Sequence, residues 1–263
     1  MNAFPFADSL DDLIREAAAY IRHARYGVVL TGAGISTPSG IPDFRSTGSG
    51  LWDKYDPFEV ASLNAFRHHP ERFFEWVRPL TREMMNAQPN PAHYAIAQLE
   101  QAGYFKTIIT QNIDGLHQRA GSKQVIEVHG TLNTATCTRC FRTYPKETFL
   151  EAFLQSGEIP RCPECGGILK PDVVLFGEQL PWKAWSAAEK AARQCDLMFV
   201  AGSSLEVTPV ANLPLIAVQS GAALIIVNHT PTYIDIRADV VLRGDVANII
   251  PRIAQAVLQS ENA

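Results

Sequence analysis

Four cysteines in two closely spaced pairs, Cys137-x-x-Cys140 and Cys162-x-x-Cys165, constrain this 263-residue chain more than any other feature. The spacing within each pair is that of a closed tetrahedral zinc site, and the 21 residues between the pairs lie just beyond the commonest separation. A closed site holds structure without performing chemistry. We therefore predict one structural Zn²⁺ ion and expect the reactive residues elsewhere. The fifth cysteine, Cys195, is expected to be an ordinary buried thiol.

The composition argues against several classes of protein. The net charge is −4 and no run of lysine or arginine occurs, so the chain lacks the electrostatic footprint of a nucleic-acid-binding protein. No apolar run reaches the ~18 residues needed to span a bilayer, and the first residues do not read as a secretory signal. Five cysteines without such a signal suit a reducing compartment. We predict a cytoplasmic monomer that binds neither nucleic acid nor a membrane directly.

Short runs rich in apolar and β-branched residues alternate with helical patterns. Several runs are apolar on both faces, as expected for strands of a parallel sheet that helices cover on each side. The runs cover residues 28–30, 107–110, 125–128, 173–176, 197–200, 224–227 and 240–242. One helix is predicted to begin after Ser9, with Asp12 completing a capping box, and the last after Asp245. The pattern predicts an α/β fold with a doubly wound, mostly parallel Rossmann-like sheet.

Two long stretches interrupt this alternation, at roughly residues 38–91 and 131–170. The first carries aromatic residues, prolines and helical spacing, and the second holds the four cysteines. We predict that they form a smaller lobe, built from a helical insertion and a zinc-ribbon insertion, with a ligand cleft between the lobes. The predicted boundaries are 1–38, 104–131 and 171–263 for the large domain, 39–103 for the helical insertion with a cofactor loop, and 132–170 for the zinc-binding module.

The first predicted strand runs directly into Gly32-Ala33-Gly34-Ile35-Ser36. Glycines at such a turn let the backbone approach a pyrophosphate, whose charge is met by amide groups at a helix start. The third glycine of the usual fingerprint is absent because Thr37 stands there. The same residues therefore also suit a tight strand-to-helix turn.

The segment Pro42-Asp43-Phe44-Arg45 follows and leads into a polar, glycine-containing loop. Phe44 and Arg45 on such a loop suit a cover over a bound ligand, with Arg45 near phosphate groups. Taken alone, these residues fit a surface turn better than a ligand cover.

Polar residues also follow four later strands. They are Gln111-Asn112-Ile113-Asp114, His129, Gly202-Ser203-Ser204 and Asn228. The carboxyl ends of parallel strands share one edge of a sheet, where such folds bind ligands. A histidine there suits a general base near neutral pH. Each signal alone also fits a turn or a structural residue, but five strand ends together predict a dinucleotide site. The other histidines are expected to be structural or solvated.

In order and combination, these motifs resemble those of the sirtuins, the NAD-dependent protein lysine deacylases, from about Asp12 to Val257, and most closely the bacterial members. The resemblance implies NAD as co-substrate and Asn112 and His129 as catalytic residues. It implies acetylated protein lysines as substrates, with nicotinamide, free lysine and O-acetyl-ADP-ribose as products. The cofactor residues that it implies are Gly32, Ala33, Gly34, Ile35, Thr37, Asp43, Phe44, Arg45, Gln111, Asn112, Ile113, Asp114, Gly202, Ser203, Ser204, Asn228 and Val246.

The resemblance also implies that a substrate peptide adds a strand between two segments of the chain. The residues that it implies are Val174, Phe176, Gly177 and Glu178 on one side, and Leu205 and Val207 on the other. Relatives that remove acidic acyl groups carry a Tyr and an Arg three residues apart, where this chain has Val77 and Leu80. An apolar pocket does not compensate a buried carboxylate, so neutral acyl groups are expected over succinyl or malonyl.

Three other functions compete with lysine deacylation. The first is mono-ADP-ribosyl transfer to a protein side chain, which would use the same pocket with a different acceptor. An interaction module without catalysis would explain the cysteines but not residues 111–114 or Asn228. A hydride-transferring dehydrogenase would need the three-glycine fingerprint and a cation that polarises the substrate, and the motifs offer neither.

Overall fold

The computed structural model describes residues 9–44, 48 and 50–259. Its main sheet has six parallel strands in the order β3-β2-β1-β7-β8-β9. They are β1 (Gly27–Thr31), β2 (Phe105–Thr110), β3 (Val125–Glu127), β7 (Leu197–Ala201), β8 (Ala223–Asn228) and β9 (Val240–Arg243). The strand order reverses between β1 and β7, which is where doubly wound sheets bind ligands at their carboxyl ends. The predicted fold class is confirmed.

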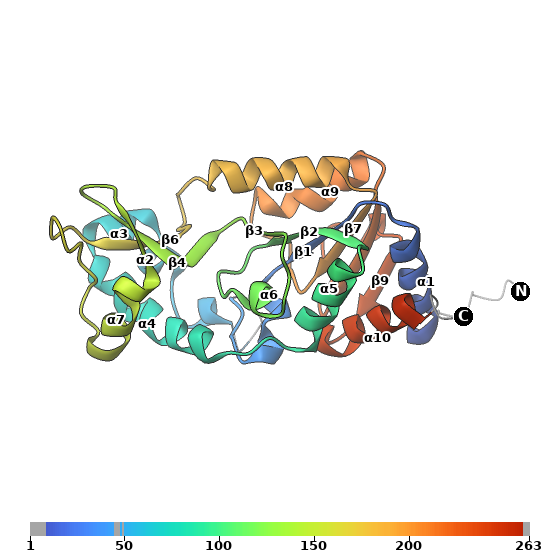
Figure 1. Ribbon diagram of the computed structural model, residues 1–263, viewed down its shortest axis with the longest axis horizontal. Coiled ribbons are helices and arrows are strands. Elements are labelled where there is room, and N and C mark those ends of the chain that lie inside the picture. Colours follow the sequence, from blue (N-terminus) through green and yellow to red (C-terminus); the bar gives the residue numbers. More distant parts are fainter. Residues whose placement is uncertain (1–8, 45–47, 49, 260–263) are drawn as a thin grey trace, which may run out of the picture.

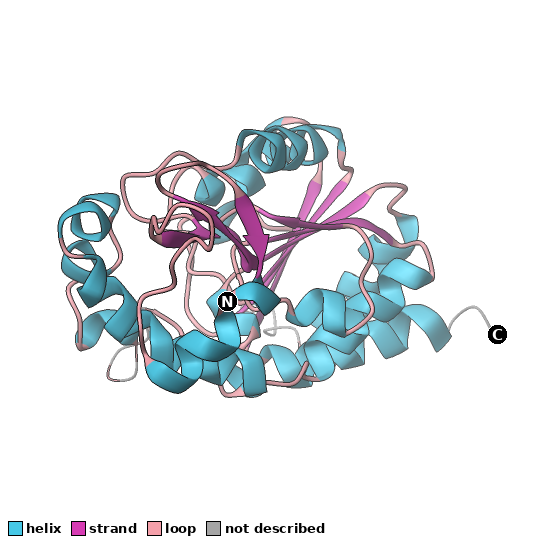
Figure 2. Ribbon diagram, turned by 60° about the vertical axis from the view of Figure 1, so that its left-hand side comes forward, coloured by secondary structure: helices cyan, strands magenta, loops and turns pink. Residues whose placement is uncertain are grey.

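Helices cover both faces of this sheet (Figures 1 and 2). One face carries α8 (Trp182–Gln194) and α9 (Leu213–Gln219), and the other carries α1 (Leu10–His23), α5 (Pro91–Gln101) and α10 (Val246–Gln259). Side chains of β1 alternate between the two cores, with Val29 in one and Val28 and Leu30 in the other. None of the helices in the described ranges combines the length and apolar character needed to cross a membrane.

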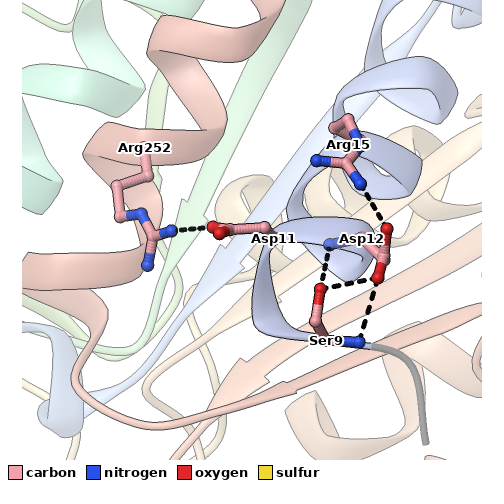
Figure 3. Close-up of polar contacts among 5 residues, drawn as sticks. All are labelled: Ser9, Asp11, Asp12, Arg15 and Arg252. Carbon is pink, nitrogen blue, oxygen red and sulfur yellow. Dashed lines mark hydrogen bonds and ion pairs between the residues drawn. The ribbon is translucent and has the colours of Figure 1, made fainter. Parts of the chain in front are cut away.

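The first helix begins as predicted, and Figure 3 shows its start. The Ser9 hydroxyl accepts the backbone N–H of Asp12 at 3.2 Å, and the Asp12 carboxylate accepts the Ser9 N–H at 3.1 Å. Asp11, beside this cap, forms an ion pair with Arg252 of α10 and so ties the first helix to the last. The last helix also begins as predicted, after Asp245, whose carboxylate accepts a backbone N–H of the first turn.

The smaller lobe comes from the two interruptions and lies at the left in Figure 1. The first contains α2 (Pro57–Val60), α3 (Leu63–His68) and α4 (Pro70–Asn86). The second contains a three-stranded antiparallel sheet of β4 (Gly130–Cys137), β5 (Thr143–Pro145) and β6 (Leu169–Val173), together with α7 (Leu150–Ser156). Phe73 and Phe74 of α4 pack in one apolar cluster with Leu150 and Phe153 of α7. The two insertions therefore share a core.

Two further helices lie between α4 and β4 in the sequence. The short helix α6 (Leu116–Arg119) follows β2, and α5, although it falls within the predicted helical insertion, packs with α1 and α10. The division into three parts by residue number stays a prediction.

The prediction of a main-sheet strand at residues 173–176 is wrong. β6 ends at Val173 and belongs to the small antiparallel sheet. Beyond it, the N–H of Val174 donates to the carbonyl of His129 at 2.8 Å, and that of Phe176 donates to Ala61 at 2.9 Å. An apolar run of this kind has the pattern of a buried strand, but the pattern does not indicate which segment its backbone hydrogen-bonds to.

Candidate functional site

A cavity of about 1110 Å³ opens at the carboxyl ends of the main strands and extends into the smaller lobe. It brings together most of the predicted cofactor, catalytic and peptide residues. Those that line it are Gly32, Ala33, Gly34, Thr37, Asp43, Phe44, Gln111, Asn112, Ile113, Asp114, His129, Val174, Phe176, Gly177, Glu178, Gly202, Ser203, Ser204, Val207, Asn228 and Val246. Ile35 and Leu205 do not line it, because their side chains are buried in the cores. Arg45 lies outside the described residues.

The glycines after β1 pack against a second glycine turn after β7. The N–H of Gly34 donates to the carbonyl of Gly202 at 2.9 Å. Gly202 has a φ of +60°, and a Cβ there would lie 2.3 Å from the backbone nitrogen of Ile35. Small residues are thus required where two loops meet, in addition to any need for close approach by a phosphate.

Ser36, Asn112 and Asp114 form a hydrogen-bonded corner of the cavity. The Ser36 hydroxyl donates to the Asp114 carboxylate at 2.7 Å, and the Asn112 amide donates to that hydroxyl at 3.1 Å. Asn112 also donates to the carbonyl of Gly32 at 3.0 Å. Burial raises the pKa of Asp114, although hydrogen bonds from Leu116 and Ser36 oppose the shift. Ser36 was not among the predicted site residues, and its place in a glycine turn concealed its role.

His129 follows β3 and points its ring toward the loop after β2. Its Nδ1 lies 3.1 Å from the carbonyl oxygen of Gln111. A carbonyl only accepts hydrogen bonds, so Nδ1 carries the proton and Nε2 is the basic nitrogen of the neutral ring. The next residue, Gly130, has a φ of +82°, and a Cβ there would lie 2.0 Å from the carbonyl oxygen of Asp172. The backbone of β6 therefore presses directly against the turn that carries His129.

A buried pair of histidines supports the polar side of the site. The rings of His93 and His117 meet edge to face with centroids 4.9 Å apart. His117 Nε2 lies 3.0 Å from the hydroxyl of Thr31, which donates to the hydroxyl of Thr110 at 2.9 Å. Thr110 in turn accepts the backbone N–H of Asn112 at 3.1 Å. Burial lowers the pKa of His93 to about 4 and that of His117 to about 3, so both rings are neutral at pH 7.

The opposite side of the cavity is apolar and comes largely from α4. Trp76, Val77, Leu80 and Met84 line it. Trp76 stacks on Trp52 with ring centroids 5.7 Å apart. Sequence reasoning anticipated Val77 and Leu80 but missed the others, since apolar residues on an amphipathic helix carry no signal that separates a cavity wall from a core.

The charged residues near this apolar side face elsewhere. Arg78 lies between Val77 and Leu80 in sequence. Its guanidinium, however, donates to the carbonyls of Leu154 (2.8 Å) and Gln155 (2.7 Å) at the end of α7. Within the described ranges, no lysine or arginine lines the cavity. The described charged residues in its lining, including Asp43, Asp114 and Glu178, are acidic.

The four paired cysteines lie together in the smaller lobe. Their sulfur atoms are all within 4.8 Å of one another, with Cys137 and Cys165 at 3.4 Å and Cys140 and Cys162 at 3.7 Å. A tetrahedral zinc ion about 2.3 Å from each sulfur requires sulfur atoms about 3.8 Å apart. The Tyr144 hydroxyl lies 3.1 Å from the sulfur of Cys162. The donor set and its spacing fit a closed zinc site, whereas Cys195 is buried apart from it, as expected.

Comparisons with known proteins cover nearly the whole chain. A model of the Sir2 family matches residues 32–209. NAD-dependent protein deacylase 2 of Archaeoglobus fulgidus is 49% identical over 255 residues, covering 96% of this chain and 100% of that protein.

Two solved structures share the fold at 42% identity. One, of Sir2 with a deacetylated p53 peptide and 3'-O-acetyl ADP-ribose, has a TM-score of 0.87 and covers 92% of this chain and 97% of its own. The other, of Sir2Af2 bound to a myristoylated histone peptide, has a TM-score of 0.82 and covers 96% and 99%. The likeness therefore extends over both lobes.

Proposed function

The chain belongs to the Sir2 family and is an NAD-dependent protein deacylase, and we propose that it transfers neutral acyl groups, above all acetyl, from protein lysines to the ADP-ribose part of NAD. The observation that carries this proposal is the meeting of two groups in one cavity. The His129 ring and the hydrogen-bonded corner of Ser36, Asn112 and Asp114 both line it. Oriented amide and carboxylate groups suit the displacement at a ribose carbon, and a base suits the deprotonation of a ribose hydroxyl in the step that follows.

The polar strand ends would hold NAD. The backbone amides of Ala33, Ser203 and Ser204 suit the diphosphate, because these N–H groups donate to no other backbone group in the described part of the chain. Asn228, whose side chain is nearly buried, suits a ribose hydroxyl of the adenosine half. Asp114 would bind the nicotinamide carboxamide, since its carboxylate is already fixed by two hydrogen bonds from the protein.

The catalytic roles follow from the positions of the side chains. When bound, NAD supplies the ribose carbon that accepts the acyl oxygen, and nicotinamide is the leaving group. Nε2 of His129 takes the proton from a ribose hydroxyl, whose oxygen attacks the acyl carbon so that the lysine amine can leave, while Nδ1 stays bonded to the carbonyl of Gln111 and fixes the ring. Asn112, held by Gly32 and Ser36, orients the reacting sugar.

The apolar side of the cavity would hold the acyl chain. Val77 and Leu80 offer no partner for a terminal carboxylate, and Arg78 is committed to the end of α7. A succinyl or malonyl group would bury an unpaired charge there, so acetyl and longer neutral chains are favoured. The myristoylated peptide bound by Sir2Af2, which is 42% identical, supports this assignment.

Two further parts of the proposal concern the peptide and the metal. The substrate backbone would pair between residues 174–178 and residues 205–207, so recognition is largely independent of peptide sequence. The four cysteines would hold one structural zinc ion, which stabilises the smaller lobe and takes no part in the reaction.

The test is mass spectrometry of an acetyl-lysine peptide incubated with and without NAD. NAD-dependent loss of acetyl with formation of O-acetyl-ADP-ribose is expected, and His129→Ala should lower the rate by about 10²–10⁴ while the melting temperature holds. Labelled NAD in the same reaction addresses the competing activity. Stable label on the protein with no loss of acetyl would contradict the proposal in favour of ADP-ribosyl transfer.

A further inference from the structure

A half-buried ion pair at the edge of the cavity, Lys170 with Glu178, has no role in the reaction described above. We propose that it is a positioning device, which holds residues 174–178 as the fixed edge against which the acylated peptide docks. This inference rests on the proposed function, because it concerns how the same enzyme binds its protein substrate.

The Lys170 ammonium bridges the two ends of this segment. Its Nζ lies 3.0 Å from Oε2 of Glu178, 2.9 Å from the carbonyl of Val173 and 3.3 Å from that of Pro171. The three donors of the ammonium are thereby used within the protein. The two side chains are only 17% and 20% exposed, so this pair is less screened than an ordinary surface salt bridge.

Glu178 closes the turn from its other end. Oε2 of Glu178 accepts the backbone N–H of Leu175 at 2.8 Å, and the N–H of Glu178 donates to the carbonyl of Leu175 at 2.9 Å. One carboxylate oxygen therefore serves both the ammonium and the backbone. Neutralising either side chain leaves the turn with a weaker closure.

The opposite side of the segment is tied to the turn that carries His129 and to the first insertion. Val174 donates to the carbonyl of His129 at 2.8 Å, and Phe176 exchanges hydrogen bonds with Ala61 and Leu63, each at 2.9 Å. A shift of this segment would thus be felt at the catalytic turn.

Just beyond the ion pair, the backbone is open to a partner. The N–H and carbonyl of Gln179 form no hydrogen bond with another backbone group in the described part of the chain. Gln179 also lines the cavity. An exposed edge of this kind pairs with an added strand, and its affinity depends on how well its direction is fixed beforehand.

The placement of the two charges separates positioning from direct contact with substrate. Glu178 lines the cavity, but Lys170 does not. Lys170 therefore acts on the peptide only through Glu178 and the backbone. A lysine that never touches substrate should still alter the KM for the peptide.

The experiment compares Lys170→Met, Glu178→Gln and the double variant by steady-state kinetics. Glu178→Gln retains an oxygen for the Leu175 N–H and removes the charge. Each single variant is expected to raise the KM for the acetyl-peptide by about 5-fold, with kcat and the KM for NAD changed by less than about 2-fold. The double variant should be no worse than the worse single variant, because both remove one shared interaction.

Glu189→Gln is the matched control, since it breaks the more exposed Arg193–Glu189 pair of α8. It should leave all three parameters unchanged. If Lys170→Met does not fold, Lys170→Gln keeps a donor for the Val173 carbonyl and replaces it.

Three outcomes would overturn the positioning role. They are an unchanged peptide KM in the lysine variant, additive effects in the double variant, and an effect of Glu178→Gln confined to peptides with basic flanking residues. An inactive wild-type enzyme would instead contradict the proposed function itself.

Discussion

The two sides of the cavity are built in different ways. The polar side consists of strand ends whose side chains hydrogen-bond to one another before any ligand arrives, as in the Ser36–Asp114 contact at 2.7 Å. The apolar side consists of helix and loop residues that pack as aromatic and aliphatic neighbours, as in the Trp52–Trp76 stack. The first is suited to fix reacting groups, and the second is suited to select by shape and by the absence of charge.

The difference extends to what supports each side. The polar side rests on the main sheet and the buried pair of His93 and His117. The apolar side belongs to the same hydrophobic cluster as cysteines of the predicted zinc site, since Leu80 and Cys162 are both members of it. Substitution of the cysteines should therefore first disturb the apolar side of the cavity, which is proposed to bind the acyl chain. Substitution of residues beneath the strand ends should first lower the catalytic rate.

The largest effect is expected from Cys162→Ser. The zinc site proposed for the four cysteines would contribute on the order of 10 kcal/mol to folding, so its loss should unfold the smaller lobe together with the apolar side of the cavity. Metal analysis and limited proteolysis measure this, with Cys195→Ser as the control because Cys195 is buried outside the cluster. If the Cys162 variant kept zinc or an intact smaller lobe, the cysteine site would not be what stabilises the apolar side of the cavity.

Gly130→Ala tests the polar side through its backbone. The added Cβ meets the Asp172 carbonyl at 2.0 Å, so the turn that carries His129 must move, at a cost of roughly 3–5 kcal/mol. Urea unfolding and kcat measure the two consequences. Gly221→Ala is matched, since its φ of +93° is equally left-handed but no atom lies within 4 Å of the new Cβ. If the two substitutions had equal effects, the close approach of residue 130 to the Asp172 carbonyl would not be the cause of the destabilisation.

Acid should weaken the support under the polar side. The lowered pKa values of His93 and His117 mean that the unfolded chain binds protons that the folded chain refuses. Above about pH 6.5 both rings are neutral in the folded and unfolded chain, and they add no pH dependence. Below it the free energy of unfolding falls by up to about 1.4 kcal/mol per pH unit for each ring, until the pH reaches about 4 for His93 and about 3 for His117.

Urea unfolding at pH 7 and pH 5 tests this. The difference between the two pH values should shrink in His93→Gln, because one of the two rings is gone. It should persist in His68→Gln, whose histidine is exposed on α3. Carboxylates contribute equally to all three proteins and cancel in the comparison.

The smallest effect is a change of selectivity in the apolar wall. Val77→Tyr with Leu80→Arg should raise the kcat/KM ratio of succinyl- to acetyl-peptide by on the order of 10-fold, because a buried carboxylate gains a partner. Leu80→Met, which keeps the wall apolar, should leave the ratio unchanged. A wild-type enzyme that already turns over both substrates equally would contradict the assignment of this wall to neutral chains.

Sequence reasoning recovered the polar side better than the apolar side for a physical reason. A polar group after a buried strand, such as Asn112 or Asn228, is a local signal, and the parallel topology then gathers such groups at one edge. Trp52, Trp76 and Met84 carry no such signal, because apolar residues at helical spacing fit a core as well as a cavity.

The errors in the fold have the same origin. Residues 173–176 have the composition of a central strand, yet their backbone bonds to His129 and Ala61. The partners lie far away along the chain, and composition does not encode them. The Lys170–Glu178 pair also escaped prediction, since the strand that carries Lys170 ends at Val173 and the turn that brings Glu178 back to it has no local signal.

The pairing of Gly130 with Val173 has a consequence for how such a chain is altered or extended. The cysteine-bearing insertion, residues 131–172, therefore begins and ends at neighbouring backbone positions. An insertion that is lengthened, shortened or exchanged should then leave the register of the six parallel strands unchanged, provided that the pairing of Gly130 with Val173 is preserved.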